Sequence, residues 1–216
     1  MAAPASLVVS KIIFPETEEP KTKGTVQVKI EKNAQNVIEA AAAGASDGLQ
    51  LALNVGAMLL AFIALIALLN YSLSAFGDLL GVNEYLRAHF SQPLNLQLVL
   101  GLILQYLALA IGVPQSEALS FGSLIGTKVV LNEFVAYLDM SQFIAQSKLV
   151  TEKGIAMATF ALCGFANFSS IAIQIGGISP MAPHRRKDLA ALGLRAVLGG
   201  ALATLMTATF AGILRG

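Results

Sequence analysis

Within the apolar segment GTKVVLNEFVAY, residues 126–137, a lysine and a glutamate stand five positions apart. Ionised side chains at membrane depth are costly, and they usually face an interior cavity or a partner of opposite charge. A spacing of five places Lys128 off the helix face of Glu133, so a local ion pair is not expected. We therefore expect the Glu133 carboxylate to accept hydrogen bonds from a polar ligand, or to carry a proton or cation charge. A structural ion pair with a lysine elsewhere in the chain remains the alternative.

A second set of polar side chains lies in the segment CGFANFSSIAIQIGG. Asn167, Ser170 and Gln174 follow the spacing of one helix face, and Gly164 lies one turn earlier on that face. Such a face can join neighbouring helices by hydrogen bonds, or it can line a cavity that binds a polar solute. Phe165 adds a flat apolar surface near the amides, although lipid or core packing would also explain it. Both interpretations of this segment stay open.

The composition predicts the environment of these residues. Hydrophobic residues make up 56% of the 216 residues and charged residues only 12%, about half the share found in soluble domains. Four long stretches contain no Asp, Glu, Lys or Arg: 48–77, 88–116, 154–183 and 196–214. Because a membrane-spanning helix needs about 20 mostly apolar residues, we predict an all-α polytopic membrane protein. The net charge of +1 gives no indication of nucleic-acid binding.

The apolar stretches predict different kinds of membrane element. One segment divides near residues 128–132 into two halves of about a dozen residues, which suits a re-entrant hairpin whose arms reach only mid-membrane. The full expectation is a tail of a truncated helix over 1–14, a cytoplasmic linker and an interfacial helix over 15–48, a transmembrane helix over 49–70, a tilted or partly inserted helix over 94–112, the re-entrant hairpin over 116–144, a broken transmembrane helix over 154–177, and a final transmembrane helix over 188–214.

Basic residues predict the orientation in the membrane. Five lysines lie between residues 11 and 32, and the segment HRRKD occupies 184–188. The positive-inside rule places both segments in the cytoplasm. This orientation requires that the segment 94–112 does not cross the membrane completely.

These motifs resemble those of the concentrative nucleoside transporters. GTKVVLNEFVAY has the form of that family's signature, small-x-Lys-x-x-x-Asn-Glu-Phe-Val-Ala-aromatic. CGFANFSSIAIQIGG is similar to the discontinuous helix that follows the family's second hairpin, and FPETE and NVGAMLLAFIALIALLN are similar to other parts of it. The resemblance therefore covers essentially the whole chain.

The resemblance implies a substrate and a site. It implies that Glu133 binds the ribose hydroxyls of a nucleoside, and a carboxylate can indeed accept from paired hydroxyl donors. It implies that Asn167 and Ser170 contact the ribose and base, with Phe165 in the same pocket. An asparagine amide can match a base edge with one donor group and one acceptor. The resemblance further implies homotrimers, and symport driven by Na+ or H+. We expect the protein to lie in the cell (inner or plasma) membrane of a bacterium.

One departure from the family pattern limits this expectation. Family members are built from two inverted repeats, and the first carries a Gly-Gln-(Thr/Ser)-Glu hairpin that reads the base and, in sodium-coupled members, supplies much of the ion site. That tetrapeptide is absent from this sequence. We therefore expect the chain to be the second, C-terminal repeat of an inverted-repeat transporter, with the coupling-ion site mostly in the other half. No cofactor is expected.

Other functions are weighed against the same residues. An intramembrane enzyme is disfavoured, because His89 and His184 lie at segment edges and neither His-Glu-x-x-His nor Gly-x-Ser-x-Gly occurs. A cation channel would rely on rings of charge or carbonyl groups, whereas these polar residues are asymmetric. A cation channel and a non-transporting membrane subunit nevertheless remain the alternatives to a symporter.

Overall fold

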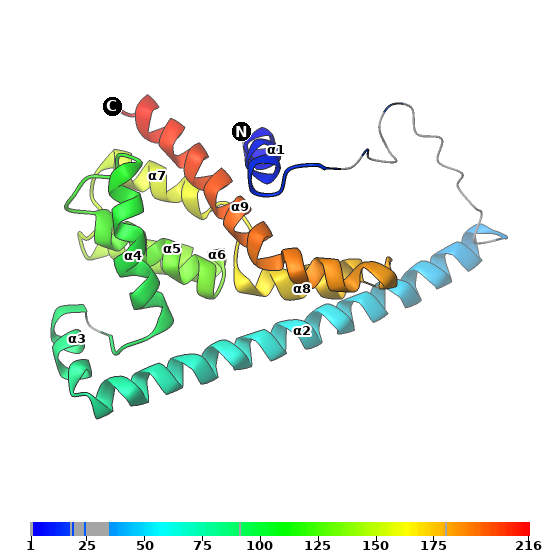
Figure 1. Cartoon of the computed structure of the whole chain (residues 1–216), viewed down its shortest axis with the longest axis horizontal. Coiled ribbons are helices and arrows are strands. Elements are labelled where there is room, and N and C mark those ends of the chain that lie inside the picture. The colour runs from blue at the N-terminus through cyan, green and yellow to red at the C-terminus, as the bar shows by residue number, and fades with distance from the viewer. Residues whose placement is uncertain (1, 18, 20–23, 25–34, 91, 180) are drawn as a thin grey trace.

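The computed structural model describes residues 2–17, 19, 24, 35–90, 92–179 and 181–216, and every regular element in those ranges is helical (Figure 1). The expectation of a cytoplasmic linker falls largely outside the described residues, as do four lysines of the basic N-terminal segment: Lys21, Lys23, Lys29 and Lys32.

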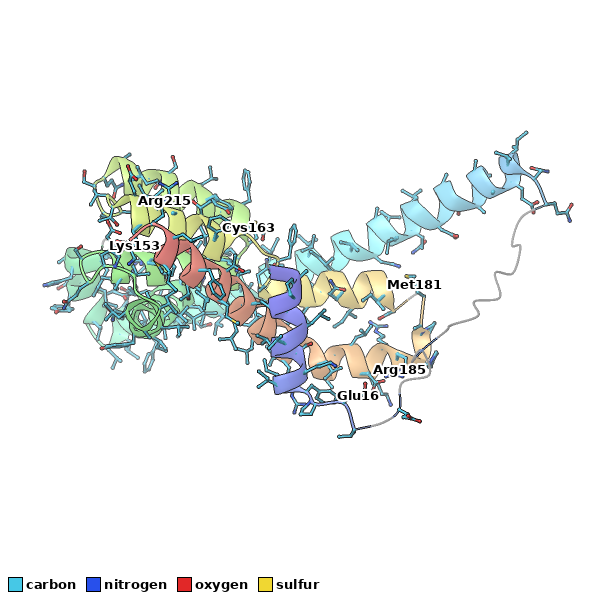
Figure 2. The ribbon with its side chains drawn as sticks, turned by 90° about the horizontal axis from the view of Figure 1, so that it is seen from above. Glu16, Lys153, Cys163, Met181, Arg185 and Arg215 are labelled. Atoms are coloured by element: carbon cyan, nitrogen blue, oxygen red, sulfur yellow. The ribbon has the colours of Figure 1, made fainter. Side chains whose placement is uncertain are left out.

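The two ends of the chain lie together. The N-terminal helix α1 (Ala2–Ile13) packs against the last helix, α9 (Arg186–Leu214). The side chains of Val9 and Ile13 approach α9 at Gly199. Figure 2, which views the molecule from above, shows α1 (blue) crossing α9. The final helix α9 begins at Arg186, two residues before the expected 188, and ends at the expected residue 214.

The helix α2 (Val37–Leu79) is longer than the sequence predicts. The interfacial helix expected at the end of the segment 15–48 and the span expected over 49–70 form a single helix of 43 residues, about 65 Å long at 1.5 Å per residue. Asn36 caps its start, because its side-chain oxygen accepts from Glu39 N at 2.8 Å. No proline interrupts the helix and alanines fill its beginning, so nothing in the local sequence ends it before Leu79.

A buried asparagine stabilises the turn of the chain that follows α2. Asn83 lies in the short helix α3 (Val82–Phe90); its Nδ2 donates to Asp78 Oδ1 at 2.6 Å, and its Oδ1 accepts from Leu94 N at 2.8 Å. The chain then enters α4 (Leu96–Ala110), which occupies the centre of the segment expected over 94–112.

Two short helices follow where the sequence predicts a hairpin. They are α5 (Ala118–Val130) and α6 (Glu133–Ala145), each of 13 residues. Each is about 20 Å long, shorter than the roughly 30 Å hydrocarbon core of a bilayer. The division falls at Leu131 and Asn132, at the end of the predicted interval.

Glycines bring α4 and α5 into close contact. A Cβ atom on Gly122 would lie 2.6 Å from Gly101 O, and one on Gly126 would lie 2.8 Å from Gln97 O. Side chains at these two positions would therefore push the helices apart. The first arm of the hairpin and α4 form one closely packed pair.

The segment 154–177 is broken, as the sequence predicts. It forms α7 (Glu152–Leu162) and α8 (Phe168–Ile178), with residues 163–167 between them. The turn η1 (Pro183–Arg185) then leads into α9. Figure 1 shows α8 lying alongside α2, and α7 beside the upper part of α9.

A buried carboxylate joins the N-terminal ends of α5 and α7. Glu117 is only 1% exposed. Its Oε1 accepts from Val150 N at 2.8 Å and from Thr151 N at 2.7 Å, and its Oε2 accepts from Thr151 Oγ1 at 2.8 Å. A Cβ atom on Gly154 would collide with the Glu117 carboxylate, so this close approach requires a glycine. The N-terminus of α7 is thereby fixed to the start of α5.

The apolar core lies among α4, α5, α6, α7 and α9. Two described stretches are long and apolar enough to cross a membrane: α2 and the continuous helical stretch Pro183–Leu214. Only 6% of the most apolar part of α2 is buried within the chain, so its apolar side chains face outward. Its surface is therefore suited to lipid or to another apolar protein surface.

Candidate substrate site

Four helix ends meet at the centre of the candidate site. The C-terminus of α5 and the N-terminus of α6 come from the hairpin, and the C-terminus of α7 and the N-terminus of α8 come from the broken helix. Asn167 Nδ2 donates to Glu133 Oε2 at 3.2 Å, and Lys128 Nζ donates to Ala161 O at 2.8 Å. These two hydrogen bonds join the hairpin and the broken helix.

Two asparagines create the helix starts at this site. Asn132 and Asn167 both have extended backbones, and each side-chain oxygen accepts a hydrogen bond from the backbone N–H three residues later. The bonds run from Val135 N at 2.9 Å and from Ser170 N at 2.7 Å. Asparagine is among the preferred N-cap residues because it satisfies an N–H that has no helical partner. The motif Asn-Glu therefore places Glu133 at the first position of α6.

Glu133 is half-buried at this helix start. The positive end of the α6 dipole stabilises a carboxylate there. Within the described residues Glu133 forms no ion pair, and the Asn167 amide is its only hydrogen-bond donor. One carboxylate oxygen therefore retains its acceptor capacity for a ligand.

The Asn167 side chain has less free hydrogen-bonding capacity than the sequence suggested. Its Oδ1 accepts from Ser170 N and also from Ser170 Oγ at 2.8 Å. The acceptor oxygen is thus used in capping α8. Only the Nδ2 group, which already donates to Glu133, has an N–H left for a ligand.

The expected single polar face is wrong in one respect. Gly164 lies in the non-helical break between α7 and α8, so it does not continue the face formed by Asn167, Ser170 and Gln174. The physical reason is the cap: once Asn167 begins a new helix, the preceding residues need not follow its periodicity. Ser169 is buried and donates to Leu131 O at 3.4 Å, beside the hairpin division.

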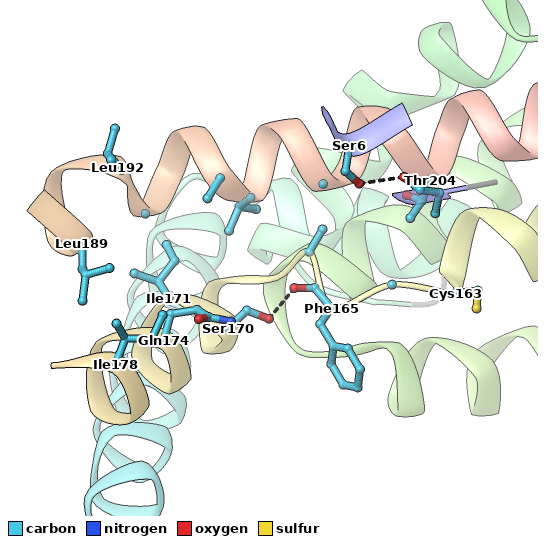
Figure 3. A pocket seen from close by; sticks show the side chains of 17 residues that line it. Ser6, Cys163, Phe165, Ser170, Ile171, Gln174, Ile178, Leu189, Leu192 and Thr204 are labelled. Carbon is cyan, nitrogen blue, oxygen red and sulfur yellow. Dashed lines mark hydrogen bonds between the residues drawn. The ribbon is translucent and has the colours of Figure 1, made fainter. Parts of the chain in front are cut away.

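Phe165 is the most exposed of the predicted site residues, at 76%. Its carbonyl accepts from Ser170 Oγ. Figure 3 shows its ring projecting from the break on the side away from α9. An exposed aromatic ring at the break between α7 and α8 offers a stacking surface for a planar ligand.

A cavity of about 410 Å³ lies between α1, α8, α9 and the break (Figure 3). Of the predicted residues, Phe165 and Ser170 line it, whereas Glu133 and Asn167 do not. The cavity lining is mostly apolar, whereas recognition of a polar substrate needs hydrogen-bonding groups. We therefore place the candidate site at the polar cluster around Glu133 and Asn167, next to the cavity.

Some residues at this site were not predicted. Lys128 was considered only as a partner for Glu133, and its contacts with Ala161 and Thr204 join segments far apart in the sequence. Glu117, at the opposite end of α5 from this site, was also missed, although a glutamate between apolar segments is as unusual as Glu133. Among the described residues, no group of three or more His, Cys, Asp or Glu side chains is placed to hold a metal ion.

Comparison with known proteins shows the family to which the chain belongs. The family model described as Na+ dependent nucleoside transporter C-terminus matches residues 1–212. An uncharacterized transporter of Haemophilus influenzae is 50% identical over 219 residues, which cover 100% of this chain and 50% of that protein. The nucleoside permease NupC of Helicobacter pylori is 44% identical over 218 residues, covering 100% of this chain and 49% of the permease.

A solved structure gives the same result for the fold. A variant of CNTnw in an outward-facing state superposes with a TM-score of 0.82 at 45% identity, covering 99% of this chain and 48% of the other. The chain thus spans about half the length of the curated relatives it matches. A transporter family implies an integral membrane protein, as the composition predicts. This chain belongs to the Na+-dependent nucleoside transporter family, whose C-terminal part it matches almost from end to end.

Proposed function

We propose that this chain forms the C-terminal part of a cation-coupled symporter that takes up nucleosides across the cell membrane of a bacterium. Its family is described as Na+ dependent, and a 44% identical relative is a nucleoside permease. The observation that carries the proposal is the carboxylate of Glu133, which has one amide donor in the described chain and lies where four helix ends meet.

The proposed site assigns a contact with the nucleoside to each predicted residue. Glu133 accepts the ribose hydroxyls, which are paired donors suited to one carboxylate. Asn167 and Ser170 contact the ribose and base through the Asn167 amide and the Ser170 hydroxyl, and Phe165 stacks on the base. The helix starts of α6 and α8 keep these groups fixed, so little side-chain freedom is lost when the substrate binds.

The proposed membrane arrangement follows the helices. The helices α5 and α6 form a re-entrant hairpin, α7 and α8 form a discontinuous transmembrane helix, and the chain is one of two inverted repeats. Broken helices that meet at the membrane midplane are typical of the substrate sites of secondary transporters. The coupling ion, Na+ or H+, is expected mostly in the other repeat, and the complete protein is expected to be a homotrimer.

The test joins this chain to the half of the Haemophilus influenzae transporter that it does not match. Uptake of radiolabelled uridine and adenosine is measured in cells that lack nucleoside transport. We expect saturable uptake above the external concentration, competed by unlabelled nucleoside. Linear, unsaturable flux would favour a cation channel, and no flux from a correctly inserted protein would favour a non-transporting subunit. Either result would overturn the proposal.

A further inference from the structure

Lys128 is fully buried in the last turn of α5, and its ammonium joins three elements around the break. Its Nζ donates to Ala161 O of α7 at 2.8 Å and to Thr204 Oγ1 of α9 at 3.1 Å. The Thr204 hydroxyl in turn donates to Ala201 O at 2.9 Å. Within the described chain Lys128 forms no ion pair with a carboxylate. The ammonium is thus held by two neutral acceptors.

The Ala161 carbonyl needs such a donor. It belongs to the last turn of α7, where carbonyl groups have no helical N–H partner, and at membrane depth no water replaces one. A cation at a helix C-terminus is also favoured by the helix dipole. Lys128 therefore satisfies a carbonyl group at the end of α7.

The second arm of the hairpin makes a parallel contact. Tyr137 of α6 donates its hydroxyl to Thr159 O of α7 at 2.8 Å. Both arms of the hairpin thus hold carbonyl groups near the end of the same broken helix.

Thr204 connects this contact to the break itself. A Cβ atom on Gly164 would lie 2.6 Å from Thr204 Cγ2, so the threonine methyl packs directly against the break. Thr204, Gly164, Phe165 and Ser170 all line the same cavity (Figure 3). A change at the Thr204 hydroxyl is therefore adjacent to residues of the candidate substrate site.

We propose that Lys128 is a positioning residue for the substrate site. Its hydrogen bonds to Ala161 O and Thr204 Oγ1 fix the position of the end of α7. The end of α7 in turn sets the positions of Phe165 and Asn167 relative to the substrate. This inference rests on the proposed function, because substrate affinity is the functional consequence it predicts. The effect of these two hydrogen bonds on the end of α7 can be measured without transport.

The test uses Thr204, because its substitutions separate the hydroxyl from the methyl group. Thr204→Val keeps the shape and removes the hydroxyl, whereas Thr204→Ser keeps the hydroxyl and removes the methyl. Thr207→Val is the matched control, since the Thr207 hydroxyl donates to Ala203 O at 3.0 Å, one turn further along the same helix, and makes no hydrogen bond with Lys128.

In the joined transporter we expect Thr204→Val to raise the KM for uridine about three- to tenfold. This is less than the tenfold or more that direct loss of a hydrogen bond to a charged group would give, because Thr204 acts on the substrate only through the position of the break. Thr204→Ser and Thr207→Val should keep the KM within about twofold of the unsubstituted protein, since neither removes that bond. A purely structural role would lower Vmax, which reports the number of folded transporters, and leave KM unchanged. Lys128→Met should change KM in the same direction as Thr204→Val and by more.

Hydrogen exchange of peptides covering residues 159–170 in the purified protein supplies the second measurement. We expect faster exchange in Thr204→Val than in Thr207→Val, because the end of α7 is released. Equal exchange in the two variants, or faster exchange with an unchanged KM, would overturn the positioning role. If even the unsubstituted joined protein fails to transport, the proposed function is wrong. The exchange comparison alone then decides whether the Lys128 hydrogen bonds hold the end of α7 in place.

Discussion

The carboxylate of Glu117 should contribute strongly to stability, because it is buried and accepts three hydrogen bonds. Glu117→Gln keeps one acceptor oxygen for Val150 N and Thr151 N but removes the charge, and it turns a donor toward the Thr151 hydroxyl. A hydrogen bond to a charged group contributes about 1.5–3 kcal/mol and a neutral one about 0.5–1.5 kcal/mol. We therefore expect a loss of about 1–2 kcal/mol of unfolding free energy for Gln.

Glu117→Ala should lose more, about 3 kcal/mol, because it also leaves two partly buried N–H groups at the start of α7 without their acceptor. Both values allow for the desolvation of the carboxylate, which its removal relieves. The matched control is Glu152→Gln, in the first turn of the same helix, where the side chain is 89% exposed and its ion pair with Arg215 spans 3.4 Å. An exposed pair of this kind contributes little, so the control should change stability by less than about 0.5 kcal/mol.

The assay heats the purified joined protein in detergent and measures the fraction that remains monodisperse on size exclusion. We expect the order of stability to be unsubstituted protein and Glu152→Gln, then Glu117→Gln, then Glu117→Ala. Should Glu117→Gln prove as stable as Glu152→Gln, the hydrogen bonds at the base of α7 would not have the strength inferred from their geometry.

Three further predictions follow from the site and the orientation. Asn167→Ser should weaken nucleoside binding while keeping the cap of α8, whereas Asn167→Ala should also cost about 1 kcal/mol of stability; equal thermal stability of the two would contradict the capping role. With Cys163→Ser as background, single cysteines at the exposed positions Ser10 and His184 should resist an impermeant thiol reagent added to intact cells, and labelling of either from outside would refute a cytoplasmic location. Expressed without its other half, the chain should give little or no concentrative nucleoside uptake, so robust saturable uptake by the 216 residues alone would show that the site is not shared between two halves.

The sequence predicted the breaks in the helices because local chemistry creates them. Asn132 and Asn167 are N-cap residues placed inside apolar segments, and each starts a helix where its neighbours alone would have continued one. The same local logic failed for α2. Nothing in the sequence near residue 49 stops a helix, and the boundary expected there came from the change in polarity, which does not end a helix by itself.

The contacts of Lys128 and Glu117 could not be predicted in the same way. Ala161 and Thr204 lie 33 and 76 residues from Lys128, so their meeting depends on how α5, α7 and α9 pack. The sequence signal that existed was the presence of charge in an apolar segment, and it identified Glu133 and Lys128 without giving their partners. Backbone acceptors such as Ala161 O carry no sequence signal at all.

The central claim, that Glu133 binds a nucleoside through its ribose, is tested most directly by a double-mutant cycle on equilibrium binding to the purified joined protein. Uridine and its 2′,3′-dideoxy analogue are titrated against the unsubstituted protein and Glu133→Gln. Replacing the carboxylate should weaken uridine binding at least about tenfold, because a hydrogen bond to a charged group, which contributes about 1.5–3 kcal/mol, is lost and a donor then faces a donor. The analogue should bind the unsubstituted protein poorly and lose little further in Glu133→Gln. If the two losses are instead fully additive, Glu133 does not contact the ribose, and this account of the site is contradicted.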